Sequence, residues 1–340
     1  MKNQFKVGSS LISKKSPSYI IAEIGMNHNG SRGLAKDMIR AAARAGANAV
    51  KFQSFKTEDF LSAKFFDFEE RKKFELSPED HKVLSKEAKK CGVEFLSTPL
   101  DNFSLELLDK LNVNIFKIAS CDLNNIPFIK DVAKKKKPVI FSTGYASMNE
   151  IHEAYQTLKK FGSGKIIIMH CVASYPTAYE DINLINIQSL QNMFPDAIIG
   201  FSDHSLDYLN IPSVAVGLGA RVIEKHFTID QKLEGYDHHM SLDEDMFSQM
   251  VNNIRTVERS LGKSRQEIGL IGDEETRILN ARRSLFWALD IPKGTKITKK
   301  HLIAKRPGRG LEPNSIGSII GKVLSEDVIL DTLVNLKEIG

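Results

Sequence analysis

An apolar run near the N-terminus ends in polar side chains that could do chemistry. The stretch YIIAEIGMNHNGS, residues 19–31, places Glu23 at the end of the apolar run and Asn27 and His28 a few positions later. A carboxyl group at the exit of a buried strand could accept or donate a proton. The amide and the imidazole could orient that centre by hydrogen bonds. They could equally brace the turn before Ser31, which could cap the next helix.

Two histidines, His204 and His226, stand at the ends of two further apolar runs. Neutral imidazole is a ligand for manganese, iron, cobalt or zinc. Two imidazoles would leave coordination positions for water and for a substrate oxygen. The pair therefore indicates a metal site. The alternative is that one or both are hydrogen-bonded histidines of the protein core.

Lysines and hydroxyl groups at other apolar runs suggest an anion. Lys51 and Lys117 emerge from apolar segments, where an unpaired charge is costly, and Ser120, Ser142 and Ser202 follow similar segments. Two ammonium groups and three hydroxyl groups could hold a phosphate or a carboxylate. The alternative is that each lysine pairs with a nearby Glu or Asp. Lys117 also allows Schiff-base chemistry of the aldolase type, which needs a desolvated amine.

The segments that carry these side chains belong to a regular series. Short apolar runs alternate with helical patterns and cover residues 19–23, 49–53, 94–98, 115–120, 138–142, 165–170, 197–202 and 221–226. Eight strands that alternate with helices over about 250 residues predict parallel pairing and a (β/α)8 TIM barrel. A doubly wound sheet is the structural alternative. In such a barrel the active site lies at the carboxyl ends of the strands, where the polar side chains occur.

Local signals support several of the intervening elements. A helix is predicted over about residues 34–45, with Gly46 ending it, and Ser77 followed by Pro78 marks the start of another. The longest insertion, residues 54–76, is predicted to be an irregular loop at the active face. Because it is rich in phenylalanine, it is expected to pack rather than to move freely.

The pattern changes after a long helix predicted over residues 243–261. We therefore assign residues 1–262 to the barrel domain, residues 263–282 to a polar linker, and residues 283–340 to a small domain of short strands and turns. A module of this size has little hydrophobic core of its own and is expected to pack against a larger domain.

The overall composition excludes several classes of protein. With 42% apolar and 26% charged residues the chain is not of the disordered class, and no apolar stretch approaches the length of about 18 residues that spans a bilayer. The N-terminus lacks the apolar core of a signal peptide and the three cysteines show no paired spacing, so we expect a cytoplasmic protein without disulfides. The basic run at residues 134–137 has no interleaved aromatics. We therefore expect no nucleic-acid or membrane partner.

A series of ordered motifs resembles those of the sialic acid synthases and their nonulosonic-acid relatives, which make N-acetylneuraminate, legionaminate or pseudaminate. The motifs are IIAEIGMNHNGS, VKFQSF, FLSTPL, FKIAS, FSTG, HCVASYPTAYED, GFSDHS, VIEKHFTID and KRPGRG, and they run essentially from end to end. The C-terminal segment resembles the antifreeze-like (SAF) domain of that family. A resemblance over so many motifs in order is far more specific than a single short pattern.

The resemblance implies a metal-dependent condensation of phosphoenolpyruvate with an N-acylated hexosamine, either N-acetylmannosamine or a 2,4-diacetamido-trideoxyhexose, with release of phosphate. It implies that His204 and His226 hold a divalent metal, usually Mn²⁺, with Mg²⁺ or Co²⁺ as alternatives. It assigns the acid/base role to Glu23. The residues implied to hold phosphoenolpyruvate are Lys51, Gln53, Lys117, Ser120, Ser142, Tyr175 and Ser202. Those implied to reach the sugar are Asp122, Asp237 and Arg306.

The resemblance also implies a domain-swapped homodimer, in which the small domain of one subunit covers the barrel mouth of the other and Arg306 acts there. Two departures leave the sugar open. Close sialic acid synthases carry Glu where this chain has Asp122, and Gly-Pro-Asp where it has Gly235, Tyr236 and Asp237. Two other hypotheses remain from the residues alone: a class I barrel aldolase that uses Lys117, and a non-enzymatic carbohydrate-binding protein.

Overall fold

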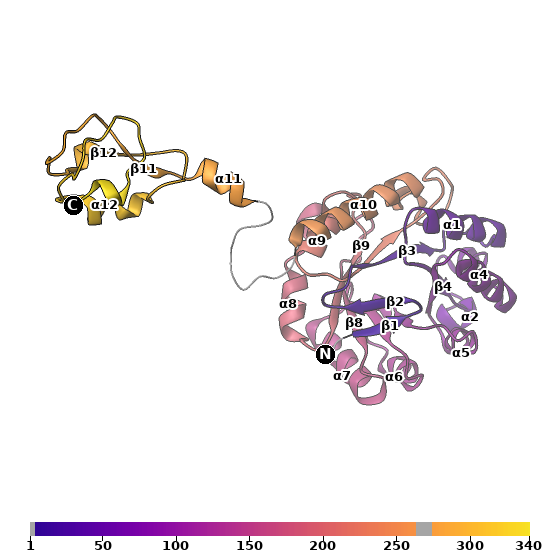
Figure 1. Ribbon diagram of the computed structural model, residues 1–340. Helices are drawn as coiled ribbons and strands as arrows, with labels where there is room; N and C mark the ends of the chain where they lie inside the picture. Colours follow the sequence, from indigo (N-terminus) through magenta and orange to yellow (C-terminus); the bar gives the residue numbers. More distant parts are fainter. Residues whose placement is uncertain (1–3, 263–273) are drawn as a thin grey trace. The chain divides into compact units, whose positions relative to one another are not determined.

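The computed structural model describes residues 4–262 and 274–340 (Figure 1). The chain divides into two compact units, Met1–Gly262 and Lys263–Gly340. Each unit is described by itself below. Within the described ranges, no helix combines the length and the apolar character needed to cross a membrane.

The first unit is built around eight parallel strands. They are β3 (Tyr19–Gly25), β4 (Ala49–Ser54), β5 (Glu94–Pro99), β6 (Phe116–Ile118), β7 (Val139–Ser142), β8 (Ile166–Cys171), β9 (Ile198–Asp203) and β10 (Val222–His226). The sheet order β5-β4-β3-β10-β9-β8-β7-β6 joins the first strand of the series to the last through the parallel pair β3–β10. Because β5 and β6 also contact each other, the sheet is a nearly closed barrel. The predicted (β/α)8 fold is confirmed, and the doubly wound alternative is wrong.

Helices surround the barrel (Figure 1). They are α1 (Arg32–Arg44), α4 (Pro78–Lys90), α5 (Asn102–Lys110), α6 (Ile126–Lys134), α7 (Met148–Phe161), α8 (Asn186–Met193), α9 (Ile211–Gly217) and α10 (Glu244–Leu261). The predicted caps are present: Ser31 accepts a hydrogen bond from the Leu34 amide, and Ser77 forms a capping box with Asp80. Gly46, with φ of 91°, follows α1 in the left-handed conformation that a β-carbon disfavours.

The two faces of each barrel strand pack against different surroundings. Ile21, Ala49 and Leu96 point inward and form the interior core of the barrel. Their neighbours Ala22 and Val50 point outward and pack against the helices. Since side chains alternate along a strand, a polar residue two positions after an inward apolar residue must also point into the barrel.

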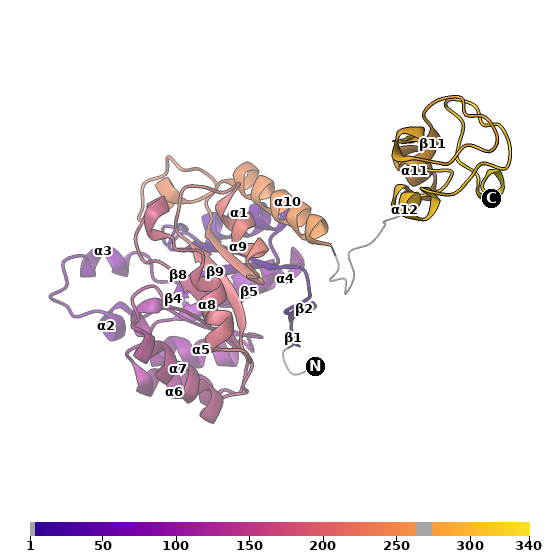
Figure 2. The same ribbon diagram turned by 90° about the vertical axis from the view of Figure 1, so that its left-hand side faces the viewer.

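A short hairpin closes the amino end of the barrel. Its strands β1 (Gln4–Val7) and β2 (Ser10–Ser13) pair antiparallel, and Phe5, Val7 and Ile12 join the interior core. The sequence analysis did not predict this element. Figure 2 shows the hairpin and the insertion after β4 at opposite ends of the barrel.

The insertion after β4 contains two short helices where an irregular loop was predicted, α2 (Thr57–Phe60) and α3 (Phe68–Lys72). The expectation that it packs is confirmed in part. Phe55 and Phe74 are buried in a small apolar cluster with Met26, whereas Phe66 is 89% exposed. The insertion is therefore anchored at its two ends and leaves aromatic surface at its tip.

The second unit contains α11 (Glu274–Ala281), β11 (Ser284–Trp287), β12 (Leu302–Lys305) and α12 (Ile316–Ile319). The part of the predicted linker over residues 274–281 is thus helical, and residues 263–273 lie outside the described ranges. The unit also has a more definite core than its size suggested. Trp287 is fully buried and donates from its indole nitrogen to Glu338 at 2.9 Å, and its apolar neighbours are Leu285, Ile291, Ile297, Leu302, Ile319, Leu324, Val328 and Val334.

Candidate active site

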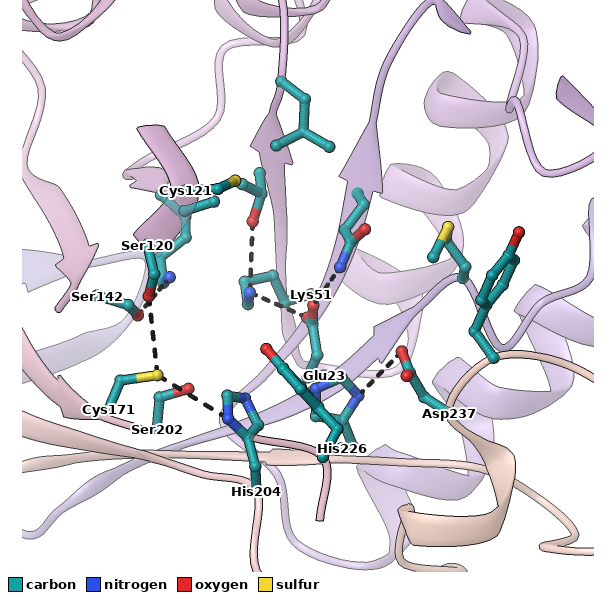
Figure 3. Close-up of a pocket in the computed structure, with 18 of the residues that line it drawn as sticks. Glu23, Lys51, Ser120, Cys121, Ser142, Cys171, Ser202, His204, His226 and Asp237 are labelled. Atoms are coloured by element: carbon teal, nitrogen blue, oxygen red, sulfur yellow. Dashed lines mark hydrogen bonds and ion pairs between the residues drawn. The ribbon is translucent and has the colours of Figure 1, made fainter. Parts of the chain in front are cut away.

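A cavity of about 560 Å³ opens at the carboxyl ends of the barrel strands. All but two of the predicted site residues line it: Glu23, Lys51, Gln53, Lys117, Ser120, Ser142, Tyr175, Ser202, His204, His226 and Asp237. Figure 3 shows most of them converging from separate strands. The strand-end argument from the sequence therefore predicted which side chains meet.

Strand register explains why these side chains are neighbours. Glu23 on β3 stands beside Lys51 on β4 and beside His226 on β10. Glu224 on β10 stands beside Ser202 on β9. Because Glu224 and His226 are two residues apart on one strand, both point into the barrel. Residues separated by about 200 positions in the sequence are thus brought to one centre.

A buried cluster of one lysine and two carboxyl groups forms the floor of the cavity. Lys51 Nζ lies 3.1 Å from Glu23 Oε2 and 3.3 Å from Glu224 Oε1. The Ser202 hydroxyl also donates to Glu224 at 3.0 Å. For Lys51, then, the alternative of a lysine paired with acidic residues is confirmed.

The two carboxyl groups have opposite proton affinities. Burial raises the pKa of Glu23 to about 7, because the attraction of Lys51 is partly cancelled by the charge of Glu224. Burial also acts on Glu224, but Lys51, Lys117 and the Ser202 hydrogen bond outweigh it and lower its pKa to about 2. Glu224 therefore holds the negative charge, and Glu23 can gain or lose a proton near neutral pH.

Lys117 is in a different position from Lys51. Its Nζ donates to the Ser142 hydroxyl at 2.7 Å and to the Ile118 carbonyl at 3.2 Å. Among the described residues no carboxylate lies within 4.0 Å of it, the limit for an ion pair. Burial lowers its pKa. A buried ammonium that faces a hydroxyl but no carboxylate is suited to an anionic ligand.

The two imidazoles face each other with their ring centroids 5.4 Å apart. His204 Nδ1 lies 2.8 Å from the Val172 carbonyl, which can only accept, so Nδ1 carries the proton and Nε2 is free. His226 Nδ1 is buried without a hydrogen bond in the described part of the chain and lies 3.6 Å from Asp237 Oδ2. The alternative interpretation was that these are hydrogen-bonded histidines of the core. Among the described residues, it applies only to Nδ1 of His204.

The protonation state of both rings suits a metal ligand. Burial, reinforced by the neighbouring His226, lowers the pKa of His204 to about 4. Burial, reinforced by Lys51, lowers that of His226 to about 3. Both rings are therefore neutral at physiological pH, which is the form that binds a metal ion.

The donor set fits a divalent metal bound by two protein ligands. The described residues hold no group of three or more His, Cys, Asp and Glu side chains arranged for a metal ion. The chain would accordingly supply the two imidazoles, and water and substrate oxygens would supply the other ligands. An unsatisfied buried nitrogen on His226 is the observation that favours such an occupant.

Tyr175 and Gln53 complete the wall around these groups. The Tyr175 ring packs on His204 with centroids 4.1 Å apart and meets His226 edge-on at 6.0 Å. Gln53 Nε2 donates to Glu23 Oε1 at 3.5 Å. Gln53 thus contacts the carboxyl group that can change its charge.

Two predicted sugar-binding residues are not among those that line the cavity. Asp122 is half-buried in the short turn after β6, its Oδ2 has no hydrogen-bond partner among the described residues, and burial raises its pKa to about 6. Its neighbour Cys121 lines the cavity instead. Arg306 belongs to the second unit and is exposed there.

Asn27 and His28 brace the turn after β3. Asn27 Nδ2 donates to the Phe227 carbonyl and to the Ser241 hydroxyl, at 2.9 and 2.8 Å. His28 Nδ1 accepts from the Gly30 amide at 3.1 Å. Neither side chain is among those lining the cavity. The bracing interpretation is confirmed, and the idea that they orient Glu23 is wrong.

The sequence analysis did not assign several lining residues. Glu224 and Cys171 come from barrel strands, and Arg71 and Tyr236 come from the insertion and from the segment after β10. Glu224 could have been found, because its spacing of two from His226 puts both on one face. The others depend on contacts between loops that sequence spacing does not reveal.

Family models match both parts of the chain. The model of the NeuB family matches residues 38–266, which is more than half of the sequence, and the model of the SAF domain matches residues 282–339. The chain belongs to the NeuB family. Its match to the SAF model covers the part of the small unit that follows α11.

Named relatives align with this NeuB-family chain over almost its whole length. The uncharacterized protein MJ1065 of Methanocaldococcus jannaschii is 44% identical over 331 residues, 97% of each chain. The N,N'-diacetyllegionaminic acid synthase of Legionella pneumophila is 39% identical over 92% of each chain. The human N-acetylneuraminate-9-phosphate synthase is 33% identical over 94% of this chain and 93% of its own.

Solved structures agree with the fold of this NeuB-family chain. The N-acetylneuraminic acid synthetase of Leptospira borgpetersenii, in complex with citrate, superposes with a TM-score of 0.77 at 36% identity and covers 81% of this chain and 95% of its own. The spore coat polysaccharide biosynthesis protein SpsE of Bacillus subtilis has a TM-score of 0.71 at 37% identity and covers 99% of both chains.

Proposed function

We propose that the protein condenses phosphoenolpyruvate with the open-chain aldehyde of an N-acylated hexosamine, giving a nine-carbon 2-keto sugar acid and phosphate. The acceptor is N-acetylmannosamine or a 2,4-diacetamido-trideoxyhexose. Relatives named as synthases of legionaminic, pseudaminic and neuraminic acids place the chain among enzymes that form carbon–carbon bonds. The observation that carries the proposal is one cavity holding two neutral imidazoles, an ammonium group without a carboxylate partner among the described residues, and a carboxyl group with a pKa near 7.

The charge of the cavity favours phosphoenolpyruvate. With Glu23 protonated, the two positive charges of Lys51 and Lys117 face the single negative charge of Glu224. Because Lys51 and Lys117 are buried, their surplus positive charge is weakly screened and attracts an anion. Lys117 and Ser142 form a ready pair of donors for a phosphate or carboxylate oxygen. Ser120, Ser202, Gln53 and Tyr175 line the same cavity.

We assign a divalent metal, most simply Mn²⁺, to His204 and His226. Such an ion would polarise the aldehyde oxygen of the acceptor and stabilise the negative charge that develops there. Asp237, whose carboxylate lies 3.6 Å from His226 Nδ1, lines the cavity beside the imidazoles and is assigned to the sugar. Burial raises the pKa of Asp237, so it can share a proton with a sugar hydroxyl.

Glu23 is the group that we expect to move a proton during turnover. When C3 of phosphoenolpyruvate forms a bond to the aldehyde carbon, positive charge remains at C2. A water molecule adds there and gives one proton to Glu23, while the oxygen of the former aldehyde takes up a proton to become a hydroxyl group. The hydroxyl group on C2 then passes its proton to the leaving phosphate as the bond from C2 to the phosphate oxygen breaks, which leaves a ketone at C2. Glu224, held ionised by Lys51, cannot take this proton near neutral pH because its pKa is about 2.

The substitution Glu23→Gln is expected to separate proton transfer from binding. Since the amide keeps the shape but accepts no proton, kcat should fall about a hundredfold or more, with little change in the affinity for phosphoenolpyruvate. In the unaltered protein kcat should rise with pH through about 7 as Glu23 ionises. Initial rates from pH 5.5 to 8.5 check both statements. A variant with unaltered kcat and pH profile would remove Glu23 from the mechanism.

The function as a whole is tested by phosphate release. Purified protein is mixed with phosphoenolpyruvate, Mn²⁺ and either N-acetylmannosamine or a 2,4-diacetamido-6-deoxyhexose. We expect phosphate release that depends on the sugar and on the metal, together with a 2-keto acid product. Absence of phosphate release with every sugar of the panel would overturn the proposal.

One observation favours a second candidate, a Schiff-base aldolase. Lys117 is buried in the barrel and its pKa is lowered, as the nucleophilic lysine of such an enzyme requires. Treatment with pyruvate and borohydride would then add a stable mass label at Lys117. We expect no label, because the condensation proposed above forms no imine.

We extend the proposal to the assembly and to Arg306. The protein is expected to form a homodimer in which the SAF domain of one subunit serves the barrel of the other. Arg306 is exposed, and the structure describes no hydrogen bond or ion pair of its side chain within residues 4–262 and 274–340. A free guanidinium group is suited to a carboxylate or to sugar oxygens.

A further inference from the structure

A buried ion pair lies on the outer face of the barrel wall, next to the strand ends that carry the imidazoles. Lys225 and Asp203 are register partners on β10 and β9, and Lys225 Nζ lies 2.7 Å from Asp203 Oδ2. Each side chain is only 1% exposed. The neighbouring outward residues Ile223 and Phe201 are apolar and pack against the helices. A charged pair in this layer is costly to bury, so its presence calls for a role.

The ammonium of Lys225 holds a segment of backbone as well as a carboxylate. Besides Asp203 it donates to the carbonyl of Ser205 and, at 3.1 Å, to the carbonyl of Asp207. The Ser205 hydroxyl lies near the same nitrogen as a more distant acceptor, at 3.5 Å, so all three of its protons have partners. Asp203 Oδ1 in turn accepts from the Ser205 amide at 2.8 Å. Residues 203–207 are thus wrapped around one ammonium group, and His204 lies inside this segment.

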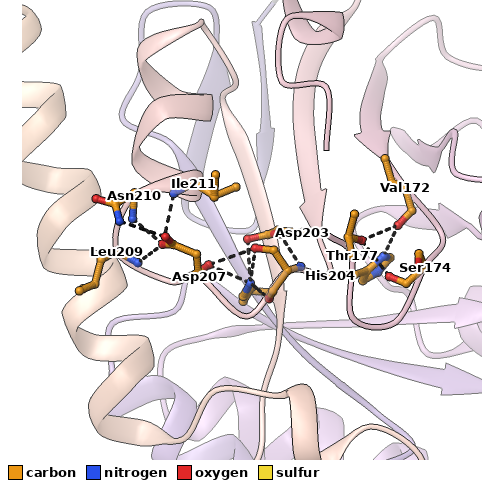
Figure 4. Close-up of polar contacts among 11 residues, drawn as sticks. Val172, Ser174, Thr177, Asp203, His204, Asp207, Leu209, Asn210 and Ile211 are labelled. Carbon is orange, nitrogen blue, oxygen red and sulfur yellow. Dashed lines mark hydrogen bonds and ion pairs between the residues drawn. The ribbon is translucent and has the colours of Figure 1, made fainter. Parts of the chain in front are cut away.

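The far end of the same segment is fixed to α9. The Asp207 carboxylate accepts from the backbone amides of Leu209 and Asn210, at 2.9 and 2.7 Å, and from that of Ile211, the first residue of α9, at 3.4 Å. Figure 4 shows the contacts of Asp207 with Leu209 and Asn210 and, beside them, those of Asp203 and of His204. The backbone on both sides of His204 therefore has little freedom to move.

His204 is also held from the loop after β8. Its ring donates to the Val172 carbonyl, and its own carbonyl accepts from the Thr177 amide at 3.0 Å. Thr177 is buried and donates from its hydroxyl to the Ser174 carbonyl at 2.8 Å. The loop after β8 thereby fixes the direction of the ring and holds the His204 carbonyl, while Lys225 holds the backbone that follows His204.

We propose that Lys225 and Asp203 are positioning residues for the two imidazoles. Lys225 directly precedes His226 on β10 and binds the segment that carries His204, so one side chain links both rings. Together the pair sets the distance and direction of His204 relative to His226. The inference rests on the proposed function, because it concerns the metal assigned there. Groups that orient metal ligands typically change the metal affinity about 10- to 100-fold when they are removed.

Metal affinity is the readout that distinguishes positioning from a purely structural role. In Lys225→Met, the Kd for Mn²⁺ is expected to rise about tenfold or more, measured on the metal-free protein by the electron paramagnetic resonance signal of free Mn²⁺. The Kd for phosphoenolpyruvate, measured by calorimetry without metal, is expected to change much less, because Lys51 and Lys117, the two cations assigned to it, lie on β4 and β6. Asp203→Asn, which keeps the size of the side chain, is expected to raise the Mn²⁺ Kd as well.

Arg255→Met provides the matched control. Arg255 also makes an ion pair, with Glu258 at 2.9 Å, and donates to the Ser18 carbonyl at 3.0 Å. Ser18 directly precedes β3, at the amino end of the barrel and opposite the cavity. This variant is expected to lose thermal stability and to keep the Mn²⁺ affinity of the unaltered protein.

Each outcome of this experiment decides a question. If Lys225→Met and Asp203→Asn are folded by circular dichroism and bind Mn²⁺ as tightly as the unaltered protein, the inference is overturned. If Lys225→Met does not fold, Asp203→Asn alone decides it. If Mn²⁺ still binds as tightly to the variant that lacks both imidazoles, His204→Ala with His226→Ala, the metal assignment fails and the inference fails with it. If His226→Ala loses Mn²⁺ binding but Lys225→Met binds Mn²⁺ as tightly as the unaltered protein, the inference is overturned and the metal assignment stands.

Discussion

Replacing either His204 or His226 by alanine is expected to lower kcat about a thousandfold or more, with the fold intact. A thousandfold change corresponds to about 4 kcal/mol, within the range that a polarising metal contributes to a transition state. Both rings are neutral and line the cavity, so each can bind the ion directly. The measurement is phosphate release at saturating phosphoenolpyruvate and sugar over a range of Mn²⁺ concentrations.

His170→Asn is the control for this prediction. His170 is buried on β8, but its Nε2 donates to the Ile182 carbonyl at 2.6 Å and its ring stacks on Phe201 in the helix-facing layer. This variant is expected to lower the melting temperature and to keep kcat. If both alanine variants retain substantial metal-dependent turnover, the assignment of the two imidazoles is wrong.

The barrel strands could be predicted because each is a short apolar run that ends in polar residues. The hairpin of β1 and β2 could not, because only Phe5, Val7 and Ile12 of its eight residues are buried. Four-residue alternations are too short to stand out from a loop. The hairpin is stabilised by the interior core that it closes, which is a tertiary effect rather than a local one.

The sequence predicted which residues form the candidate site but not which of their charges are paired. Strand ends identify Lys51 and Glu23, yet the ion pairs of Lys51 with Glu23 and with Glu224 depend on the register of β3 with both β4 and β10. Residue types and spacing say nothing of register across strands so far apart in the chain. For that reason the sequence could not show that Lys51 is paired and Lys117 is not.

The part of the cavity that we assign to the sugar was the least predictable. Tyr236, which stands where close sialic acid synthases have proline, donates from its hydroxyl to Asp67 in the insertion at 3.0 Å. Arg71 lies over the Tyr236 ring at 4.2 Å and binds Asp67 at 2.8 Å. These contacts join segments about 170 residues apart in the chain, and both segments line the cavity. The shape presented to the acceptor therefore arises from a loop contact that a motif does not encode.

The second large effect is expected from mixing two inactive variants, Arg306→Ala and His226→Ala. If Arg306 serves the partner's barrel, a mixed dimer has one barrel with intact imidazoles that receives an intact Arg306. Its other barrel carries both lesions. Random exchange of equal amounts makes half of the dimers mixed, so activity should recover to about a quarter of that of the unaltered protein.

The reason for choosing Arg306 lies in its contrast with Arg309 in the same basic loop. Arg309 donates to Asn280 at 2.9 Å and is thereby tied to α11 within its own unit, whereas no such partner of Arg306 occurs in the described part of the chain. Arg309→Ala alone is accordingly expected to remain active and serves as the control. Subunit exchange is verified with two affinity tags, and phosphate release is followed as the variants are mixed. Proven exchange without any recovery of activity would show that Arg306 acts on its own barrel or on none.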